Sequence, residues 1–263
     1  NAFEHNARPI VNNGTFEIHG DELFTSLDLT AAGFTSGLTK IVSNGSTTIL
    51  APSIDGLGNV EFNTAGQIIE LGEHIAYITG NIEVISPSIV KMEEFNLTLA
   101  DRMTLTNNGV WSATTPSTFT CAGNATFAGD DMGFFNFTAV SINTDTLIFE
   151  STKTYTVNGA LTLTGADDEA ELFLNTNDAS KAYIDNVGQS EAVNFVRVLK
   201  VDGTLANSID AENSWDVDNT LPNRLLYWNF GAMLYTCDGT GNWSDTAVWE
   251  QEMLPRVTDN ILV

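Results

Sequence analysis

The sequence predicts an all-β protein, built as a right-handed parallel β-helix (a β-solenoid) with almost no α-helix. Three observations support this prediction: short runs of alternating residues, a Gly-Asn dipeptide that returns at a regular spacing, and a lack of sustained helical periodicity. In a solenoid, each turn of the chain is a coil whose two or three short strands stack on those of the next coil. We therefore expect one elongated body.

Strand-like alternation runs through much of the chain. β-Branched or aromatic residues occupy alternate positions, and Gly, Asn and Asp separate the runs, which is typical of short strands bounded by turns. Residues 87–103 show a weak helical spacing of apolar residues, but their Thr, Asn and β-branched content favours strands. The clearest runs are residues 59–62, 81–85, 95–99, 102–106, 117–123, 146–150, 154–165 and 171–175.

A regular repeat underlies these strands. Gly-Asn dipeptides followed by alternating residues begin at Gly58, Gly80 and Gly123, and the second separation is close to twice the first. Gly and Asn suit the corners of a solenoid, because both tolerate left-handed backbone angles and the Asn amide can pair with carbonyls of the neighbouring coil. The repeat therefore predicts that each coil is about as long as the segment that separates Gly58 from Gly80.

Strands that carry the same dipeptide should share one face of the body. We expect the side chains that point from them into the core to include Phe62, Val84 and Phe127. A β-sandwich is the alternative, since its strands also recur roughly every 8 to 12 residues. The regular repeat and the scarcity of Asn-Gly hairpins favour the solenoid, although dipeptides such as Asn158-Gly159 keep the sandwich open.

Length and charge narrow the class further. The 263 residues can bury a sizeable core as a single domain. Thirty-four acidic residues against ten basic ones give a net charge of −24 at pH 7, with no basic cluster, so the chain would repel nucleic acid. No window is long and apolar enough to span a bilayer. We expect no nucleic-acid partner and no membrane span.

The first residue is Asn rather than Met, and no apolar leader follows it. This start suggests a processed or excised segment of a larger exported precursor, or else a trimmed fragment. Either way, we expect an extracellular or cell-surface location.

Three longer stretches resemble a known kind of protein: TLIFESTKTYTVNGALTLTGADDEAELFLNTND (146–178), the Val- and Asp-rich stretch at 182–230, and GNWSDTAVWEQEMLPRVTDNILV (241–263). They resemble modules found in tandem in very large bacterial surface and secreted proteins of the right-handed β-helix, adhesin-like type. Similar stretches occur in phage-like fibre proteins. The resemblance covers residues 123–263 well and 58–122 loosely.

The resemblance implies a fold and a setting rather than a reaction. It implies a non-enzymatic structural module, a repeating and self-assembling block of a surface adhesin, fibre or filament, with a virion fibre or decoration module as an alternative. Its partners would be further copies or modules, and a surface glycan. The sequence departs from the pattern at residues 221–230, where Pro222 and Arg224 replace a Gly-rich corner and leave the register of the last coil open.

Two regions follow from this resemblance. Residues 1–232 should form the solenoid, with a weaker match over 1–122 and a stronger one over 123–232. Residues 233–263 resemble the start of a following module, so they should join the N-terminal coil of another copy head to tail. The alternative is that the two tryptophans cover the core of their own chain. The expected junction residues are Trp243, Trp249, Asp245, Asp259, Ile261 and Val263.

Enzymatic chemistry is the main alternative from another class, because many β-helices are polysaccharide lyases or glycoside hydrolases. Such enzymes need paired carboxylates, often with a basic residue or calcium, on one face of adjacent coils. We predict no catalytic residue, because the acidic groups lie in expected corners, where they serve solubility. These groups are Asp130-Asp131, Asp167-Asp168-Glu169 and Asp216-Asp218, and the isolated histidines are His5, His19 and His74.

Calcium is the one cofactor that the sequence suggests, and otherwise none is expected. Residues 201–220 place hard oxygen ligands in a loop-rich segment, but they match neither an EF-hand loop nor the repeat of calcium β-rolls. The candidate ligands are Asp202, Asp210, Asp216 and Asp218.

Asn-x-Ser/Thr sequences offer candidate glycosylation sites, although several arise by chance in a chain rich in Asn and Thr. Sugar inside an expected strand would require the asparagine to face outward. The sites are Asn13, Asn44, Asn96, Asn124, Asn136 and Asn242.

Cys121 and Cys237 occupy matching contexts, each an aromatic residue and Thr before Cys and a small or acidic residue and Gly after it. On the predicted repeat they lie about five coils apart, and coils stack at about 4.8 Å, so a disulfide would need the C-terminal segment to fold back. Two buried thiols are favoured, with a bridge as the alternative.

Overall fold

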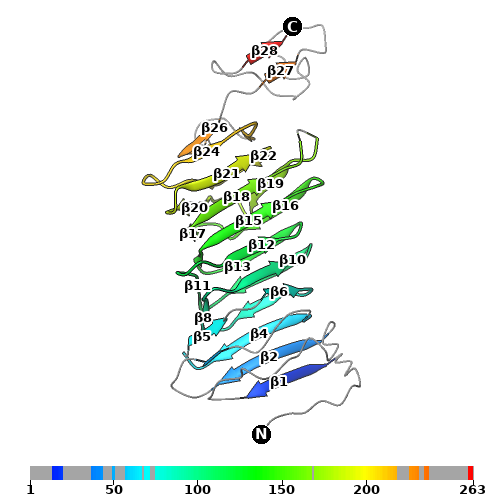
Figure 1. Cartoon of the computed structure of the whole chain (residues 1–263), viewed down its shortest axis with the longest axis vertical. Helices are drawn as coiled ribbons and strands as arrows, with labels where there is room; N and C mark the ends of the chain where they lie inside the picture. The colour runs from blue at the N-terminus through cyan, green and yellow to red at the C-terminus, as the bar shows by residue number, and fades with distance from the viewer. Residues whose placement is uncertain are drawn as a thin grey trace.

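The computed structural model describes residues 14–19, 37–43, 49–50, 57–66, 68–71, 75–167, 169–217, 225–230, 234–236 and 260–262. Within these residues the protein is all-β and contains no helix. The strands form parallel sheets stacked as a β-solenoid of about 8 coils (Figure 1). The predicted fold class is confirmed.

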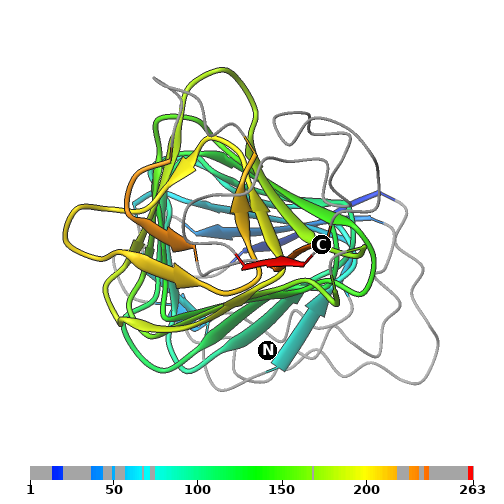
Figure 2. The ribbon, with the colours of Figure 1, turned by 90° about the horizontal axis from the view of Figure 1, so that it is seen from above.

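Three parallel sheets form the sides of the solenoid. The chain visits them in turn, so that hydrogen-bonded neighbours in each sheet come from successive coils. This order explains the alternating sequence, because each short strand turns one set of side chains inward and the other outward. Viewed from above, the coils superimpose around a common interior (Figure 2).

The ten-stranded sheet has the order β1-β2-β4-β7-β10-β13-β16-β19-β22-β25. Its strands, in that order, are Thr15–His19, Leu38–Ser43, Asn59–Thr64, Ile82–Val84, Met103–Asn107, Ala125–Gly129, Asp145–Phe149, Leu172–Thr176, Val196–Val198 and Trp215–Asp216.

The eight-stranded sheet has the order β23-β20-β17-β14-β11-β8-β5-β3. Its strands, in that order, are Val201–Asp202, Ala182–Asn186, Thr154–Val157, Met132–Phe134, Val110–Ser112, Ile89–Met92, Ile68–Leu71 and Ile49–Leu50.

The six-stranded sheet has the order β21-β18-β15-β12-β9-β6. Its strands, in that order, are Ser190–Asn194, Ala160–Thr164, Asn136–Val140, Thr118–Cys121, Asn96–Leu99 and Ile75–Ile78. Two short parallel pairs follow: β24 (Ile209–Ala211) with β26 (Trp228–Phe230), and β27 (Leu234–Thr236) with β28 (Asn260–Leu262).

Aromatic side chains stack through the interior from coil to coil. Phe127 packs on Phe149 of the next coil with ring centroids 5.3 Å apart, and Phe119 packs on Phe137 at 6.0 Å, both nearly face to face. Because equivalent positions of successive coils lie about 4.8 Å apart, similar side chains at one inward position can stack on one another. The core is therefore one continuous column.

The strands that carry the Gly-Asn repeat share the ten-stranded sheet, as predicted. Phe62 pairs with Val84, and the side chains of Phe62, Val84 and Phe127 are all buried. Phe127, however, aligns through Leu105 with Ile82, two positions away from Val84. The third dipeptide is thus displaced by one pleat, which keeps Phe127 on the inward side because strand side chains alternate with a period of two.

Polar side chains connect the coils at the corners. Asn59 Oδ1 accepts the backbone N–H of Asn81 at 2.9 Å, and Asn81 Oδ1 accepts the N–H of Thr104 at 2.9 Å. The predicted pairing of an Asn amide with a carbonyl of the neighbouring coil also occurs, since Asn107 Nδ2 donates to Asp131 O at 2.8 Å. We call these contacts the corner ladder.

Coil length varies more than the repeat predicts. Phe119 pairs with Phe137 after a short coil, whereas Leu161 pairs with Glu191 after a much longer one. The strands keep their register, so the extra residues lie in the connections between sheets, where insertions are tolerated. Pro222 and Arg224 lie outside the described residues. Beyond them, β26 continues the stack on β24, and Figure 1 places the pair of β27 and β28 past it.

Candidate functional site: the polar corner around Lys153

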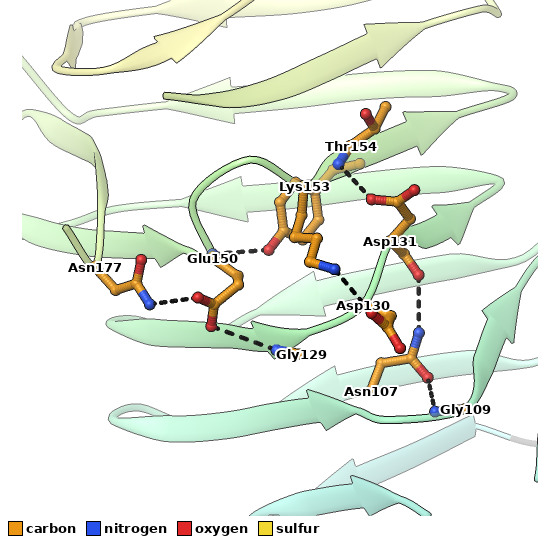
Figure 3. Close-up of polar contacts among 10 residues, drawn as sticks. Asn107, Gly109, Gly129, Asp130, Asp131, Glu150, Lys153, Thr154 and Asn177 are labelled. Carbon is orange, nitrogen blue, oxygen red and sulfur yellow. Dashed lines mark hydrogen bonds and ion pairs between the residues drawn. The ribbon is translucent and has the colours of Figure 1, made fainter. Parts of the chain in front are cut away.

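A cluster of polar contacts forms where the ten-stranded sheet turns into the eight-stranded sheet (Figure 3). Lys153 precedes β17, and Asp130 and Asp131 precede β14 one coil earlier. The Nζ atom of Lys153 lies 2.8 Å from Oδ1 of Asp130, and this hydrogen bond is the main cause that raises the pKa of Lys153. Both side chains are partly open to solvent, so the pair adds little to stability.

Asp131 connects three successive coils. Its Oδ1 atom accepts the backbone N–H of Thr154 at 2.8 Å, in the coil that follows. Its backbone carbonyl accepts Asn107 Nδ2 at 2.8 Å, from the preceding coil, and Asn107 Oδ1 in turn accepts the N–H of Gly109 at 3.2 Å. Asp131 therefore belongs to the corner ladder.

Glu150 makes a similar connection on the other side of Lys153. Its Oε1 atom accepts Asn177 Nδ2 at 2.7 Å, and its backbone N–H donates to the hydroxyl of Tyr155 at 2.8 Å. The Tyr155 ring is buried against Phe149, with centroids 4.8 Å apart. This burial raises the pKa of Tyr155 far above its usual range, so the hydroxyl remains protonated.

This corner brings together the kinds of group that a β-helix enzyme needs, namely carboxylates and a basic residue on adjacent coils. Three carboxylates, from Asp130, Asp131 and Glu150, lie near Lys153 on adjacent coils (Figure 3). Each carboxylate, however, accepts a hydrogen bond from a neighbouring coil or from Lys153. The arrangement satisfies hydrogen-bond donors at the corner and connects neighbouring coils.

Asp130 and Asp131 are among the acidic groups expected from the sequence, whereas Lys153 and Glu150 are not. The spacing offered a clue, because Lys153 follows Asp130 by 23 residues, close to one coil. Opposite charges that far apart in a solenoid are neighbours in space.

The other predicted acidic groups lie apart from this cluster. Asp167 Oδ1 accepts the backbone N–H groups of Glu169 at 3.0 Å and Ala170 at 2.9 Å, which closes a local turn. Asp216 Oδ2 accepts the N–H of Leu225 at 2.9 Å. Asp168 and Asp218 lie outside the described residues.

Each of the three calcium candidates that the structure describes has its own partner. Asp202 is buried and pairs with Lys181, whose Nζ lies 3.0 Å from its Oδ2 atom, and Asp210 accepts Asn229 Nδ2 at 2.7 Å. In the part of the chain that the structure describes, no group of three or more His, Cys, Asp or Glu side chains could hold a metal ion. His5 and His74 lie outside that part, and His19 lies in β1.

Three of the Asn-x-Ser/Thr asparagines belong to the corner ladder. Asn124 Oδ1 accepts the N–H of Thr146 at 2.9 Å, while its Nδ2 atom donates to Asp101 at 2.9 Å and to Asp145 at 3.1 Å. Nδ2 is the atom that a sugar would modify. Glycosylation at Asn124 would therefore remove at least one of the two Nδ2 contacts.

The other two described sites make the same contact to the next coil. Asn96 Oδ1 accepts the N–H of Thr118 at 2.9 Å, and Asn136 Oδ1 accepts the N–H of Ala160 at 2.8 Å. Asn96 is exposed and Asn136 half-buried, so both face outward as a sugar would require. Asn13, Asn44 and Asn242 lie outside the described residues.

Cys121 is a free, buried thiol, as predicted for this residue. It points inward from β12, and burial raises the pKa of the thiol well above its usual range. Cys237 lies outside the described residues, so the predicted absence of a bridge stays a prediction.

Most of the predicted junction also falls outside the described residues, namely Trp243, Trp249, Asp245, Asp259 and Val263. Ile261 is described, in β28, where its backbone pairs with Tyr235 of β27 in the same chain. One side of the terminal strand is therefore occupied by its own chain.

Comparison with known proteins adds no relative. No protein family, no curated protein and no solved structure matches the chain. Among the residues that the structure describes, no helix is long and apolar enough to cross a membrane.

Proposed function

We propose that the protein is a non-enzymatic structural module of an extracellular surface adhesin, fibre or filament, with a virion fibre as the related alternative. The supporting observation is that polar corner side chains, including the cluster around Lys153, bond from one coil to the next. Groups that could serve chemistry serve stacking instead. A column held by three parallel sheets, a continuous core and the corner ladder is stiff along its axis.

Assembly head to tail is the second part of the proposal. A solenoid presents unpaired strand edges at both ends, and such edges pair with added strands. The segment 233–263, with Trp243 and Trp249, would supply this contact to the first coil of a further copy. The net charge of −24 opposes lateral aggregation of these rods.

Deletion of residues 241–263 tests the assembly. We expect the full chain to form oligomers or filaments in sedimentation velocity and electron microscopy, and the shortened chain to remain folded, β-rich and monomeric. A matched variant, Trp243→Ala with Trp249→Ala, keeps the chain length and should also lose assembly. Normal assembly of both variants, or unfolding of both, would contradict the head-to-tail proposal.

A carbohydrate-active enzyme is the second candidate, favoured by the three carboxylates near Lys153. The variant Asp130→Asn with Asp131→Asn should leave any release of reducing ends from a panel of polysaccharides at background, as for the wild type. The variant Asp167→Asn with Asp168→Asn and Asp216→Asn should likewise leave folding and binding unchanged. Cleavage by the wild type that either variant abolishes would establish the enzyme instead.

A further inference from the structure

The outward face of the six-stranded sheet is uncharged over most of its length. Five of its strands, β6, β9, β12, β15 and β18, contain no charged residue, although the chain has 34 acidic and 10 basic residues. The sixth strand, β21, contains Glu191, whose carboxylate accepts Asn186 Nδ2 at 2.6 Å and the N–H of Asp210 at 3.0 Å. We call the outward side of this sheet the neutral face.

A rank of threonines runs along the neutral face. Thr98, Thr120, Thr138 and Thr162 are register partners on four successive coils, with Tyr77 at one end and Ala192 at the other. Their spacing is that of neighbouring strands, about 4.8 Å. The alternate residues of these strands are buried, so the threonines point outward.

The hydroxyls of this rank are available to a ligand. Within the described residues, none of the four makes a side-chain hydrogen bond. The amide oxygens of the neighbouring Asn96 and Asn136 are already used in the corner ladder. Each free hydroxyl can donate one hydrogen bond and accept two, and each threonine also presents a methyl group.

The outward residues on either side of the rank are also uncharged. Thr118 and Ala160 lie two positions before it along their strands, and Val140 and Thr164 lie two positions after it, about 6.7 Å away. A parallel sheet held by a continuous core presents these positions as a rigid, repeating array. The array loses little conformational entropy when a ligand binds.

The size and chemistry of the face restrict what can bind. Six strands with about four residues each make a surface on the order of 300 Å², below the roughly 800 Å² that each partner buries in a stable protein complex. A second copy is therefore a poor occupant. Charged ligands find no opposite charge there.

A dissolved glycan also fits poorly. Binding sites for small organic ligands are mostly concave and lined with aromatic groups. The neutral face is the outer side of a parallel sheet rather than a cavity, and Tyr77 is the one aromatic side chain at the outward positions of this sheet that the structure describes.

We infer that the neutral face binds ice. An ice surface is neutral, flat and periodic, and it presents hydrogen-bond donors and acceptors at a regular spacing similar to that of the array. Threonine hydroxyls can take positions in that lattice while the methyl groups occupy the gaps between water molecules. Charged side chains would hold their own oriented hydration shells, so their absence from this face favours the match.

The test measures how much protein a slowly growing ice front incorporates from dilute solution, read as protein absorbance in the ice and in the remaining liquid. The wild type should enter the ice. The variant Thr120→Lys with Thr138→Lys places two charges in the centre of the rank and should be excluded to the level of an unrelated control protein.

The matched control is Thr104→Lys with Thr126→Lys. These two threonines are also register partners on adjacent coils and face outward, but from the ten-stranded sheet. This variant should enter ice like the wild type, and circular dichroism should show both variants folded.

Four results would overturn the inference: exclusion of the wild type from ice, equal loss in both variants, a rank-dependent dimer without ice incorporation, or rank-dependent binding to insoluble neutral polysaccharide without ice incorporation. None of these results bears on the head-to-tail proposal, whose test uses the terminal segment. The two ideas can therefore fail separately.

Discussion

Two outward rows of the same solenoid carry different side chains, although both belong to parallel sheets. One row of the ten-stranded sheet contains, coil by coil, Glu17, Lys40, Glu61, Glu83, Thr106 and Ala128. One row of the six-stranded sheet contains Tyr77, Thr98, Thr120, Thr138, Thr162 and Ala192. The first row begins with four charged residues and ends with Thr106 and Ala128, whereas the second has no charge.

Inward and outward positions of the strands are under different constraints. Inward positions must fill one continuous core, so both sheets present aromatic and aliphatic residues there. Outward positions are free to differ, because the backbone of a parallel sheet is satisfied by its neighbours whatever the side chains are. The surface of each face can thus change without altering the fold.

The largest expected effect breaks the core that the two faces share. Phe119→Ala, inward on the six-stranded sheet, and Phe127→Ala, inward on the ten-stranded sheet, should each lower the free energy of unfolding by about 3–5 kcal/mol, because each leaves a cavity in the aromatic column. Thr120→Ala, next to Phe119 but outward, should change it by less than about 0.5 kcal/mol. Urea unfolding of the three variants checks this, and a small effect of only one Phe variant would show that the core is not continuous.

The next effect concerns the corner that joins the two sheets. Asn124→Ala removes the acceptor of the Thr146 N–H and the donor to two carboxylates, so it should cost about 1–3 kcal/mol. Asn63→Ala is the control, because exposed Asn63 bonds only the side chain of Glu61, at 3.3 Å. Its cost should stay within about 0.5 kcal/mol. Urea unfolding measures both losses of unfolding free energy. Equal losses in the two variants would show that the corner ladder does not stabilise the protein.

A smaller effect separates the charged face from the neutral face. Lys40 Nζ lies 3.1 Å from Glu61 Oε1, and Glu61 also neighbours Glu83 in register. Because the Glu61 side chain is largely buried, Lys40→Gln should destabilise by about 1 kcal/mol at low ionic strength, and added salt should reduce part of the loss. Thr98→Gln on the neutral face should show no such salt dependence. Melting temperatures over a salt series decide this, and a salt-independent loss for Lys40→Gln would contradict an electrostatic origin of the loss.

The smallest effect depends on pH at the corner between the same two sheets. Hydrogen bonds from Asn124, first from its side chain and then from its backbone, lower the pKa of Asp101. Because the folded pKa lies below the unfolded value of about 3.9, the stability that Asp101 contributes is present above that value and lost as pH falls through the folded pKa. Asp101→Asn should therefore show a shallower loss of stability below about pH 4. Melting curves at several acidic pH values test this, and an unchanged slope would contradict it.

Local patterns in the chain were enough to establish the class of fold, because alternation with a period of two and the recurrence of Gly-Asn from coil to coil are both visible along the sequence. Phe62, Val84 and Phe127 could be assigned to the core for the same reason: a strand residue keeps its side of the sheet whenever it moves by two positions. The buried state of Cys121 followed from the same alternation.

Which residues meet between coils depends instead on how the whole coils pair. The coil that joins Phe119 to Phe137 is short and the coil that joins Leu161 to Glu191 is long, and nothing local in the sequence measures how much chain each connection uses. The pairing of Lys153 with Asp130, the ladder role of Asn124 and the rank of threonines on the neutral face all depend on that length. They become visible once the strands are in register, because neighbours across a parallel sheet are set by the pairing of whole coils rather than by distance along the chain.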